Sequence, residues 1–262
     1  EEIDVPAQYI IPKAQTITVV KDKTNELNFR NVLKKGTVTT TKVDKDYPEN
    51  KLSGAEFTVF YADGKTYGKL VEGTGTKKGV YTLKNIPYGN YYLKETKAPT
   101  GFVLDTKKYS FSITKNGQVE NIETEAGKGF VNTPIKGSIE VVKVDGTTKK
   151  PLSGAVFELR NSSGTTIQTL TTGTDGKVKF ENIRYGKYTV VETKAPNNYD
   201  LDSTPIPFEI LENGKTIPYT KDNTPTPAPL KIVKTSEDGK IDGIKFHIYG
   251  TSNTGVKVDL TK

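Results

Sequence analysis

The stretch Tyr91-Tyr92-Leu93-Lys94-Glu95-Thr96-Lys97-Ala98-Pro99-Thr100-Gly101-Phe102 returns further along the chain as Tyr188-Thr189-Val190-Val191-Glu192-Thr193-Lys194-Ala195-Pro196-Asn197-Asn198-Tyr199. Side chains alternate between the two faces of a β-strand, so in each copy the glutamate shares a face with the aromatic and the aliphatic residue before it. A carboxylate that continues an apolar stripe is costly to bury in its charged form, so we expect the pKa of Glu95 and of Glu192 to rise. A neutral, buried Glu in the same place of two repeats requires a polar partner from elsewhere in the chain.

The composition favours small β domains over one large core. Only 33% of the 262 residues are hydrophobic, and the absence of Met indicates an excised segment. A low apolar fraction of this kind suits domains with much surface for their volume. No apolar run is long enough to cross a membrane and no signal peptide is recognisable, so we expect no membrane insertion.

The residue types exclude or disfavour several classes of function. Without Cys the chain forms no disulfide, no thiolate zinc site and no cysteine nucleophile. His247 is the only His, so neither a histidine-based metal site nor a Ser-His-Asp triad is supported, and we expect no metal and no cofactor. The net charge of +7 invites a nucleic-acid partner, but the lysines are interspersed among 31 acidic residues. That pattern favours a solvated surface and no nucleic acid.

Two long units follow the same order of strands and turns. Each begins with a strand rich in β-branched residues, continues through Leu-Ser-Gly-Ala, the glutamate strand and an Asn-Gly hairpin turn, and ends in Asn-Thr-Pro. No helical period is sustained, so about seven short strands per unit predict an all-β sandwich. Short proline-bearing joints and the repetition divide the chain into two complete domains, 34–134 and 135–225, and two partial ones, 1–33 and 226–262.

Polar residues extend apolar stripes on other strands of each unit. Lys143 shares a face with Ile139 and Val141, and Asn132 shares one with Phe130, whereas the signal for Lys42 is weaker. Lys, Glu and Asn thus lie on the first, a middle and the last strand of each predicted sandwich. We expect them to converge on its core.

Two interpretations of such a set remain open from the residues alone. One is a buried Lys–Glu ion pair with an Asn hydrogen-bonded nearby. The other is covalent: the lysine amine attacks the asparagine side-chain carbonyl, forms an amide and expels ammonia. Burial would supply the neutral amine by lowering the lysine pKa, to about 5–6 in the extreme. A protonated Glu would act as general acid and base.

The units resemble the Cna B-type (SpaA-type) domains of Gram-positive surface adhesins and pilins. The resemblance covers essentially the whole chain and rests on three motifs: the glutamate motif at 91–102, Leu-Ser-Gly-Ala-x-Phe at 52–57 and 152–157, and Asn-Thr-Pro at 132–134 and 223–225. It implies tandem prealbumin-like (inverse immunoglobulin) sandwiches, each with a spontaneous Lys–Asn isopeptide bond assisted by the Glu.

Carried over by this resemblance, Glu95 and Glu192 are the catalytic residues. The cross-linked residues are Lys42 with Asn132 and Lys143 with Asn223. The sequence departs from the family pattern at Asn198, where the family favours Gly, and at Asp222, which stands beside the acceptor of the second unit.

The resemblance implies a stalk segment of a cell-wall-anchored adhesin or pilus protein that projects an adhesive domain. Its partners would be neighbouring domains of the same extracellular surface protein, and host extracellular matrix through a domain outside this chain. The anchor motif would also lie outside it. The alternatives are a pilus backbone subunit and a module that itself binds extracellular matrix. An enzyme is disfavoured, because the only chemistry on offer is a single self-modification.

The two ends carry incomplete sets. Glu2 with the following Pro and Tyr reproduces the spacing of the glutamate motif, and Asn31 ends that piece, but it has no Lys. Lys234 begins a further unit that stops before its Glu. Within the first piece, 16–20 and 27–31 are predicted strands. We expect flanking structure to order both ends, either a longer parent chain or a neighbouring molecule that brings Lys234 to Asn31.

Overall fold

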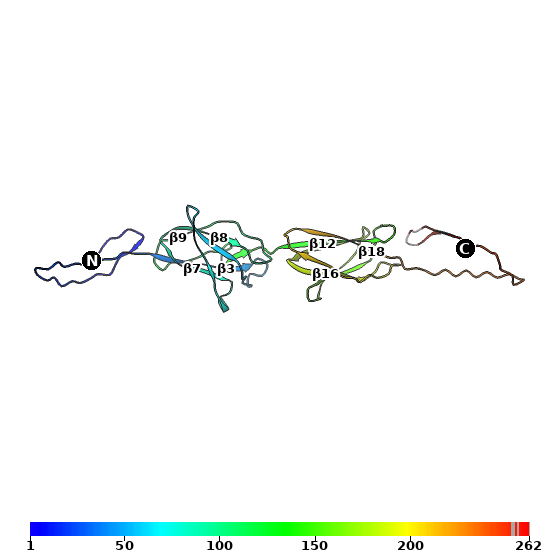
Figure 1. Cartoon of the computed structure of the whole chain (residues 1–262), viewed down its shortest axis with the longest axis horizontal. Coiled ribbons are helices and arrows are strands. Elements are labelled where there is room, and N and C mark those ends of the chain that lie inside the picture. Colours follow the sequence, from blue (N-terminus) through cyan, green and yellow to red (C-terminus); the bar gives the residue numbers. More distant parts are fainter. Residues whose placement is uncertain (253–254, 256, 262) are drawn as a thin grey trace. The chain divides into compact units, whose positions relative to one another are not determined.

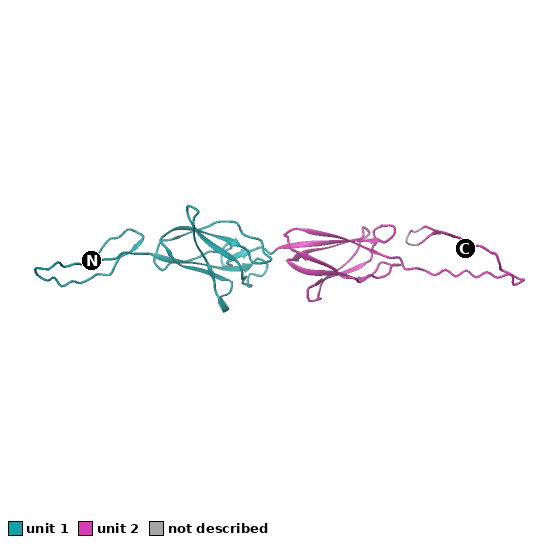
Figure 2. Cartoon of the chain, in the orientation of Figure 1, with its two compact units in different colours: residues 1–134 teal, residues 135–262 magenta. Residues whose placement is uncertain are grey.

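The computed structural model describes residues 1–252, 255 and 257–261. It contains two compact units, residues 1–134 and 135–262 (Figure 2). Each unit contains a two-layered β-sandwich, which confirms the predicted all-β class (Figure 1). No helix in the described ranges is long and apolar enough to cross a membrane.

The sandwich of unit 1 consists of two facing sheets. The first has the order β10-β3-β7-β6, and β11 also pairs with β3; the second has the order β5-β4-β8-β9. Strand β3 runs parallel to β10 and β11 and antiparallel to β7. The bounds are β3 Lys35–Asp44, β4 Glu56–Tyr61, β5 Thr66–Lys69, β6 Val71–Glu72, the 3-10 helix η1 Gly75–Lys77, β7 Val80–Pro87, β8 Gly89–Lys97, β9 Tyr109–Ile113, β10 Val119–Asn121 and β11 Phe130–Asn132.

Unit 2 repeats this architecture with longer, uninterrupted outer strands. Its sheets have the orders β15-β12-β18 and β14-β13-β16-β17. A single strand, β18, takes the place of both β10 and β11 and runs parallel to β12. The bounds are β12 Lys136–Asp145, β13 Val156–Asn161, β14 Thr166–Thr171, β15 Lys177–Arg184, β16 Gly186–Lys194, β17 Ile206–Ile210 and β18 Thr216–Asn223.

The core of each sandwich consists of the inward-facing alternate residues of both sheets. In unit 1 these include the fully buried side chains of Val38, Phe57, Leu93 and Phe130. Each such side chain contributes about 1.5–3 kcal/mol when it leaves water. Unit 2 has an equivalent core, formed by Ile139, Val141, Phe157, Leu159, Phe180 and Val190 together with neighbouring aliphatic residues.

The Asn-Gly turns differ from the prediction, because they do not close hairpins. Strand β9 belongs to one sheet and β10, after the turn at Asn116-Gly117, to the other. Strands β17 and β18 are separated in the same way by Asn213-Gly214. Each turn therefore carries the chain across the core to a strand parallel to the first strand of its unit. That crossing places the end of each unit beside its beginning.

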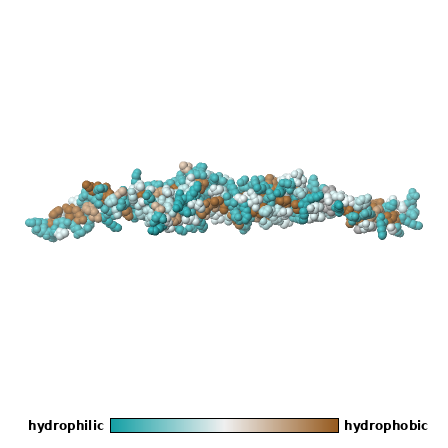
Figure 3. All heavy atoms as spheres, turned by 90° about the horizontal axis from the view of Figure 1, so that it is seen from above, coloured by the Kyte–Doolittle hydropathy of each residue, from teal (hydrophilic) through white to brown (hydrophobic). Residues whose placement is uncertain are grey.

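The end segments form only small ladders of their own. Residues 1–33 contribute β1 Tyr9–Ile10 and β2 Val32–Leu33, and the other end contributes β19 His247–Thr251 and β20 Lys257–Thr261. The strands predicted at 16–20 and 27–31 are not formed, because β-branched residues extend stably only against a partner strand. Apolar side chains are correspondingly exposed in both end segments, among them Ile3, Val19, Leu230 and Val233. Figure 3 shows hydrophobic atoms at the surface of these segments.

Candidate functional site

The lysine of each set lies near the end of a buried stripe on the first strand of its sandwich. On β3 the inward-facing residues are Val38, Thr40 and Lys42, and on β12 Lys143 continues the stripe of Ile139 and Val141. The side chains of both lysines are fully buried. A carbonyl from the neighbouring loop holds the backbone N–H of each lysine, Gly79 in unit 1 and Gly176 in unit 2.

Gly176 shows why this neighbour is glycine. Its φ is +72°, and a Cβ atom there would lie 2.5 Å from the backbone oxygen of Lys143. Both the left-handed backbone and the close approach exclude a larger residue. The backbone of the lysine is therefore fixed from outside the sheet.

In unit 1 the structure brings Lys42, Glu95 and Asn132 together inside the sandwich. The Lys42 Nζ lies 3.3 Å from Glu95 Oε1 and donates a hydrogen bond to the Phe130 carbonyl at 3.2 Å. The Asn132 Nδ2 donates to both oxygens of Glu95 at 2.9 Å. The buried Oδ1 of Asn132 accepts no hydrogen bond from the described part of the chain. Glu95 thus joins the amine to the amide from the opposite sheet.

Burial lowers the pKa of Lys42 from its ordinary value to about 8. The negative charge of Glu95 and its hydrogen bond to the amine act in the opposite direction. The Phe130 ring, 4.5 Å from the Lys42 Nζ, adds a further contact that favours the cation. The direction matches the prediction, but the fall is smaller than the extreme of about 5–6, because the carboxylate partner is so close.

In unit 2 the structure brings Lys143, Glu192 and Asn223 together in the same way. The Lys143 Nζ lies 3.1 Å from Glu192 Oε2 and donates to the Asp222 carbonyl at 3.0 Å. It also contacts Asn223 Oδ1 directly. The Asn223 Nδ2 donates to Glu192 Oε1 at 2.8 Å. Burial again lowers the pKa of the lysine, and Glu192 opposes that effect.

The parallel pairing of first and last strands explains how residues so distant in sequence meet. Strand β11 runs beside β3 with Phe130 opposite Lys42 and Asn132 opposite Asp44. Strand β18 runs beside β12 with Asn223 opposite Asp145. Lysine and asparagine thus lie diagonally across one ladder, on the buried face of the sheet. The glutamate reaches them from the opposite layer.

Sequence reasoning missed three residues near these sets, Asp105 in unit 1 and Lys221 and Asp202 in unit 2. The backbone N–H of Asp105 donates to Glu95 Oε2 at 2.8 Å, and Asp105 also accepts from the Tyr109 hydroxyl at 2.6 Å. In unit 2, the side chain of Lys221 is buried beside Lys143, and the Lys221 Nζ lies 2.9 Å from Asp202 Oδ2. The signal available in the sequence was that Asp105 and Asp202 both stand ten positions after the glutamate of their unit.

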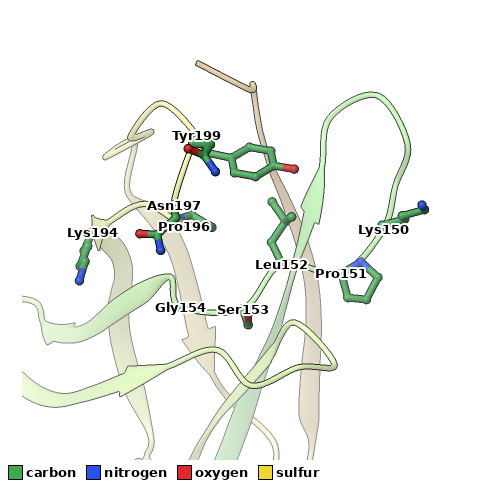
Figure 4. Close-up of a pocket in the computed structure, with 10 residues that line it drawn as sticks. Lys150, Pro151, Leu152, Ser153, Gly154, Lys194, Pro196, Asn197 and Tyr199 are labelled. Atoms are coloured by element: carbon green, nitrogen blue, oxygen red, sulfur yellow. The ribbon is translucent and has the colours of Figure 1, made fainter. Parts of the chain in front are cut away.

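Unit 2 has an additional polar contact at the end that carries its set. The Tyr199 hydroxyl donates to Asp145 Oδ2 at 2.7 Å. Beside it lies a pocket of about 470 Å³, with Tyr199, Pro196 and Asn197 on one side and Leu152 on the other (Figure 4). The pocket is lined by residues 150–154 and by residues between 194 and 199, and it does not include the lysine, glutamate or asparagine of the set.

Asp145 provides a prediction about acid stability. Burial raises its pKa, but hydrogen bonds from the Thr148 and Thr147 amides and the Tyr199 hydroxyl outweigh burial and bring the pKa down to about 2. Because the folded-state pKa lies below the unfolded one, the stabilisation is present above about pH 4 and is lost as the pH falls toward 2. Tyr199→Phe, which installs the residue type that unit 1 has at Phe102, should cost about 1 kcal/mol at neutral pH. The substitution should also raise the pH at which this stabilisation of unit 2 is lost on acidification.

The measurement is the thermal unfolding midpoint of unit 2 as a function of pH in the full chain. Unit 1 in the same sample is the control, since the substitution leaves it unchanged. An acid profile that is the same in Tyr199→Phe and in the unsubstituted chain would contradict the assignment of this hydrogen bond.

The end sets are only partly assembled. Asn31 Nδ2 donates to Glu2 Oε1 at 3.3 Å, in an exposed position. Lys234 is also exposed and precedes β19 in the other unit. Across the described ranges, no group of three or more His, Asp or Glu side chains is arranged to hold a metal ion.

Comparisons with known proteins match both sandwiches. The family model described as the SpaA prealbumin-like fold domain matches residues 36–128 and 137–225. Serine-aspartate repeat-containing protein D of Staphylococcus aureus (strain Newman) is 27% identical over 166 residues, 58% of this chain and 12% of that protein. The trypsin-resistant surface T6 protein of Streptococcus pyogenes serotype M6 is 31% identical over 141 residues, 49% of this chain and 26% of that protein. The chain therefore spans a minor part of the length of these relatives.

Solved structures show the same fold. The Bacillus anthracis TIE protein superposes with a TM-score of 0.73 at 33% identity, over 84% of this chain and 40% of that one. The C-terminal fragment of the pilus adhesin SpaC from Lactobacillus rhamnosus GG has a TM-score of 0.50 at 20% identity, over 76% of this chain and 99% of the fragment. The second likeness concerns the fold alone.

Proposed function

Because this chain belongs to the family of SpaA prealbumin-like fold domains, we propose that it is a structural stalk segment of a cell-wall-anchored adhesin or pilus protein. Among the proteins named above, one is a trypsin-resistant surface protein and one is a pilus adhesin, and none of them is named as an enzyme. In this proposal each complete sandwich is braced by an intramolecular bond between its lysine and its asparagine. The stalk projects an adhesive domain that lies outside this chain.

The chemistry starts from the neutral tautomer of the buried pair, with the proton on the Glu and an uncharged lysine amine. The Lys42 Nζ attacks Cγ of Asn132, so that a C–N bond forms and the bond from Cγ to Nδ2 breaks. Glu95 takes one proton from the attacking amine and delivers its own to Nδ2, which leaves as ammonia. Glu95 is protonated again at the end. Lys143, Glu192 and Asn223 would react in the same way.

The single observation that carries this proposal is that the lysine, the glutamate and the asparagine of the set are all buried together, in both units. A buried ion pair is weak evidence for stability, since an apolar replacement of similar volume is often as stable. Two units that keep the same costly group in the same geometry point to a use for it. In both, Nδ2 already donates to the carboxylate that would protonate it as it leaves.

The bond would serve a mechanical purpose. Lys42 and Asn132 lie on the first and last strands, so a bond between them closes a loop of about 90 residues, worth roughly 4–5 kcal/mol on the chain-entropy model. It would fill the place of the disulfides that brace other extracellular domains.

We further propose the partition into complete domains at 34–134 and 135–225, with partial domains at 1–33 and 226–262.

Peptide mapping tests the proposal directly. The chain is first allowed to fold and is then denatured and digested with a protease. The digest should contain two branched peptides, one joining the segments around Lys42 and Asn132 and one joining those around Lys143 and Asn223. Fragmentation within each branch locates the bond. Linear peptides with unmodified lysine and asparagine at all four positions would leave the buried ion pair as the correct interpretation.

A further inference from the structure

Unit 2 buries a second lysine beside the one that would react. Lys221 stands opposite Lys143 in the parallel ladder of β12 and β18, and its side chain is only 6% exposed. The Lys221 Nζ lies 2.9 Å from Asp202 Oδ2 and donates to the Thr204 carbonyl at 2.9 Å. The ammonium is thereby held in place on the buried face of the sheet.

Unit 1 has an aromatic residue at the matching position. Phe130 stands opposite Lys42 and packs edge-on against Tyr109, with ring centroids 5.0 Å apart. Burial, to which the Phe130 ring contributes, desolvates the Lys42 amine and opposes its charged form, while the face of that ring attracts the cation. Unit 2 has Lys221 and Ile206 in the places of these two rings. A lysine there removes part of the apolar surroundings and adds a positive charge.

Four charged groups act on the Lys143 amine. Glu192 comes from the facing sheet, Lys221 and Asp222 from β18, and Asp202 from the loop before β17. The three carboxylates favour a positive charge on the amine, and only the ammonium of Lys221 opposes it among these groups. Asp202 is about half exposed, so water screens it more than it screens Lys221.

We propose that Lys221 is a positioning residue for the cross-link of unit 2, an inference that rests on the proposed function. Its positive charge keeps a second proton off the pair formed by Lys143 and Glu192. The pair therefore stays singly protonated, and this state includes the reactive tautomer with a neutral amine and a neutral carboxyl. A neighbouring cation is one of the ways in which proteins activate a nucleophilic lysine.

Lys143 and Glu192 lie so close together that the two ionisable groups gain and lose protons as a pair. With two protons bound, the amine is an ammonium ion and cannot attack. Removing the charge of Lys221 strengthens proton binding to the pair. As the pH is lowered, the reaction should therefore stop at a higher pH than it does in the unsubstituted chain. Removing the charge of Asp202 should have the opposite effect.

The experiment follows bond formation during folding of the full chain. Chain purified in denaturant before it has folded is diluted into buffers of graded pH, and ammonia loss in each unit is measured by intact mass and peptide mapping. Lys221→Met should move the acid limit of bond formation in unit 2 upward by about one pH unit. Lys221→Arg, which keeps the charge, should retain the original limit, and Asp202→Asn should lower it. Unit 1 in every sample serves as the internal reference.

The outcomes separate the alternatives by sign. If Lys221 only fastens the loop at Asp202, then Lys221→Met and Asp202→Asn remove the same contact and shift the profile in the same direction, which overturns the proposal. An unchanged profile in Lys221→Met also overturns it. If Lys221→Met does not fold, Asp202→Asn still decides: an acid limit below that of the unsubstituted chain supports the proposal, and an unchanged or higher limit overturns it. Absence of ammonia loss from both units of the unsubstituted chain at every pH would instead refute the proposed function.

Discussion

The intact mass of the folded chain should be lower than its sequence mass by two molecules of ammonia, one for each complete sandwich. Both sets hold a buried lysine whose pKa is lowered by burial, and a carboxylate within hydrogen-bonding distance of the leaving nitrogen. Nothing further has to bind or be supplied, so the loss should be complete once the chain has folded. High-resolution mass spectrometry of the denatured protein measures it.

Glutamine substitutions assign the two losses to their units. Glu95→Gln keeps the size and one hydrogen-bonding oxygen but cannot carry the transferred proton, so it should restore one ammonia. Glu192→Gln should restore the other, and the double variant both. Glu158→Gln is the matched control, since Glu158 is partly exposed on β13 and pairs with Arg160 outside the core. A full sequence mass in the unsubstituted chain would rule out the covalent interpretation.

The sequence was sufficient for the fold class and for the burial of the polar side chains that end apolar stripes, whereas the cross-link assigned to both complete sets stays a prediction. Period-two stripes that end in a polar residue marked Lys143, Glu95 and Glu192 as inward-facing, and repetition showed that these were not accidents of one strand. Burial of a polar side chain at the end of an apolar stripe follows from alternation alone. For that reason such residues can be found without a structure.

The remaining features depend on which strands become neighbours. The chain crosses the core at Asn116-Gly117, and neither that crossing nor the parallel register of β11 on β3 is encoded in the local pattern. Lys221 became notable only because this register places it opposite Lys143. The predicted strand at 16–20 is not formed for the same reason, since local β-propensity produces a strand only where a partner strand is available.

Under tension applied at its two ends, the chain should extend without lengthening of either complete sandwich. The load enters each sandwich on the strand of its lysine and leaves on the strand of its asparagine, which lie side by side in one ladder. A covalent bond between these two residues carries the force directly. The chain between them then bears no load, whatever the strength of the hydrogen bonds around it.

Glu192→Ala should convert unit 2 into an extensible domain and leave unit 1 unchanged. Without the bond, the 80 residues that separate Lys143 from Asn223 become available to the force. Fully extended, they add about 270 Å to the contour length. Single-molecule force spectroscopy should show one unfolding event of this size in Glu192→Ala, one of about 300 Å in Glu95→Ala, and neither in the unsubstituted chain. If the unsubstituted chain already shows both events, hydrogen bonds and packing carry the load, and the cross-links are not formed.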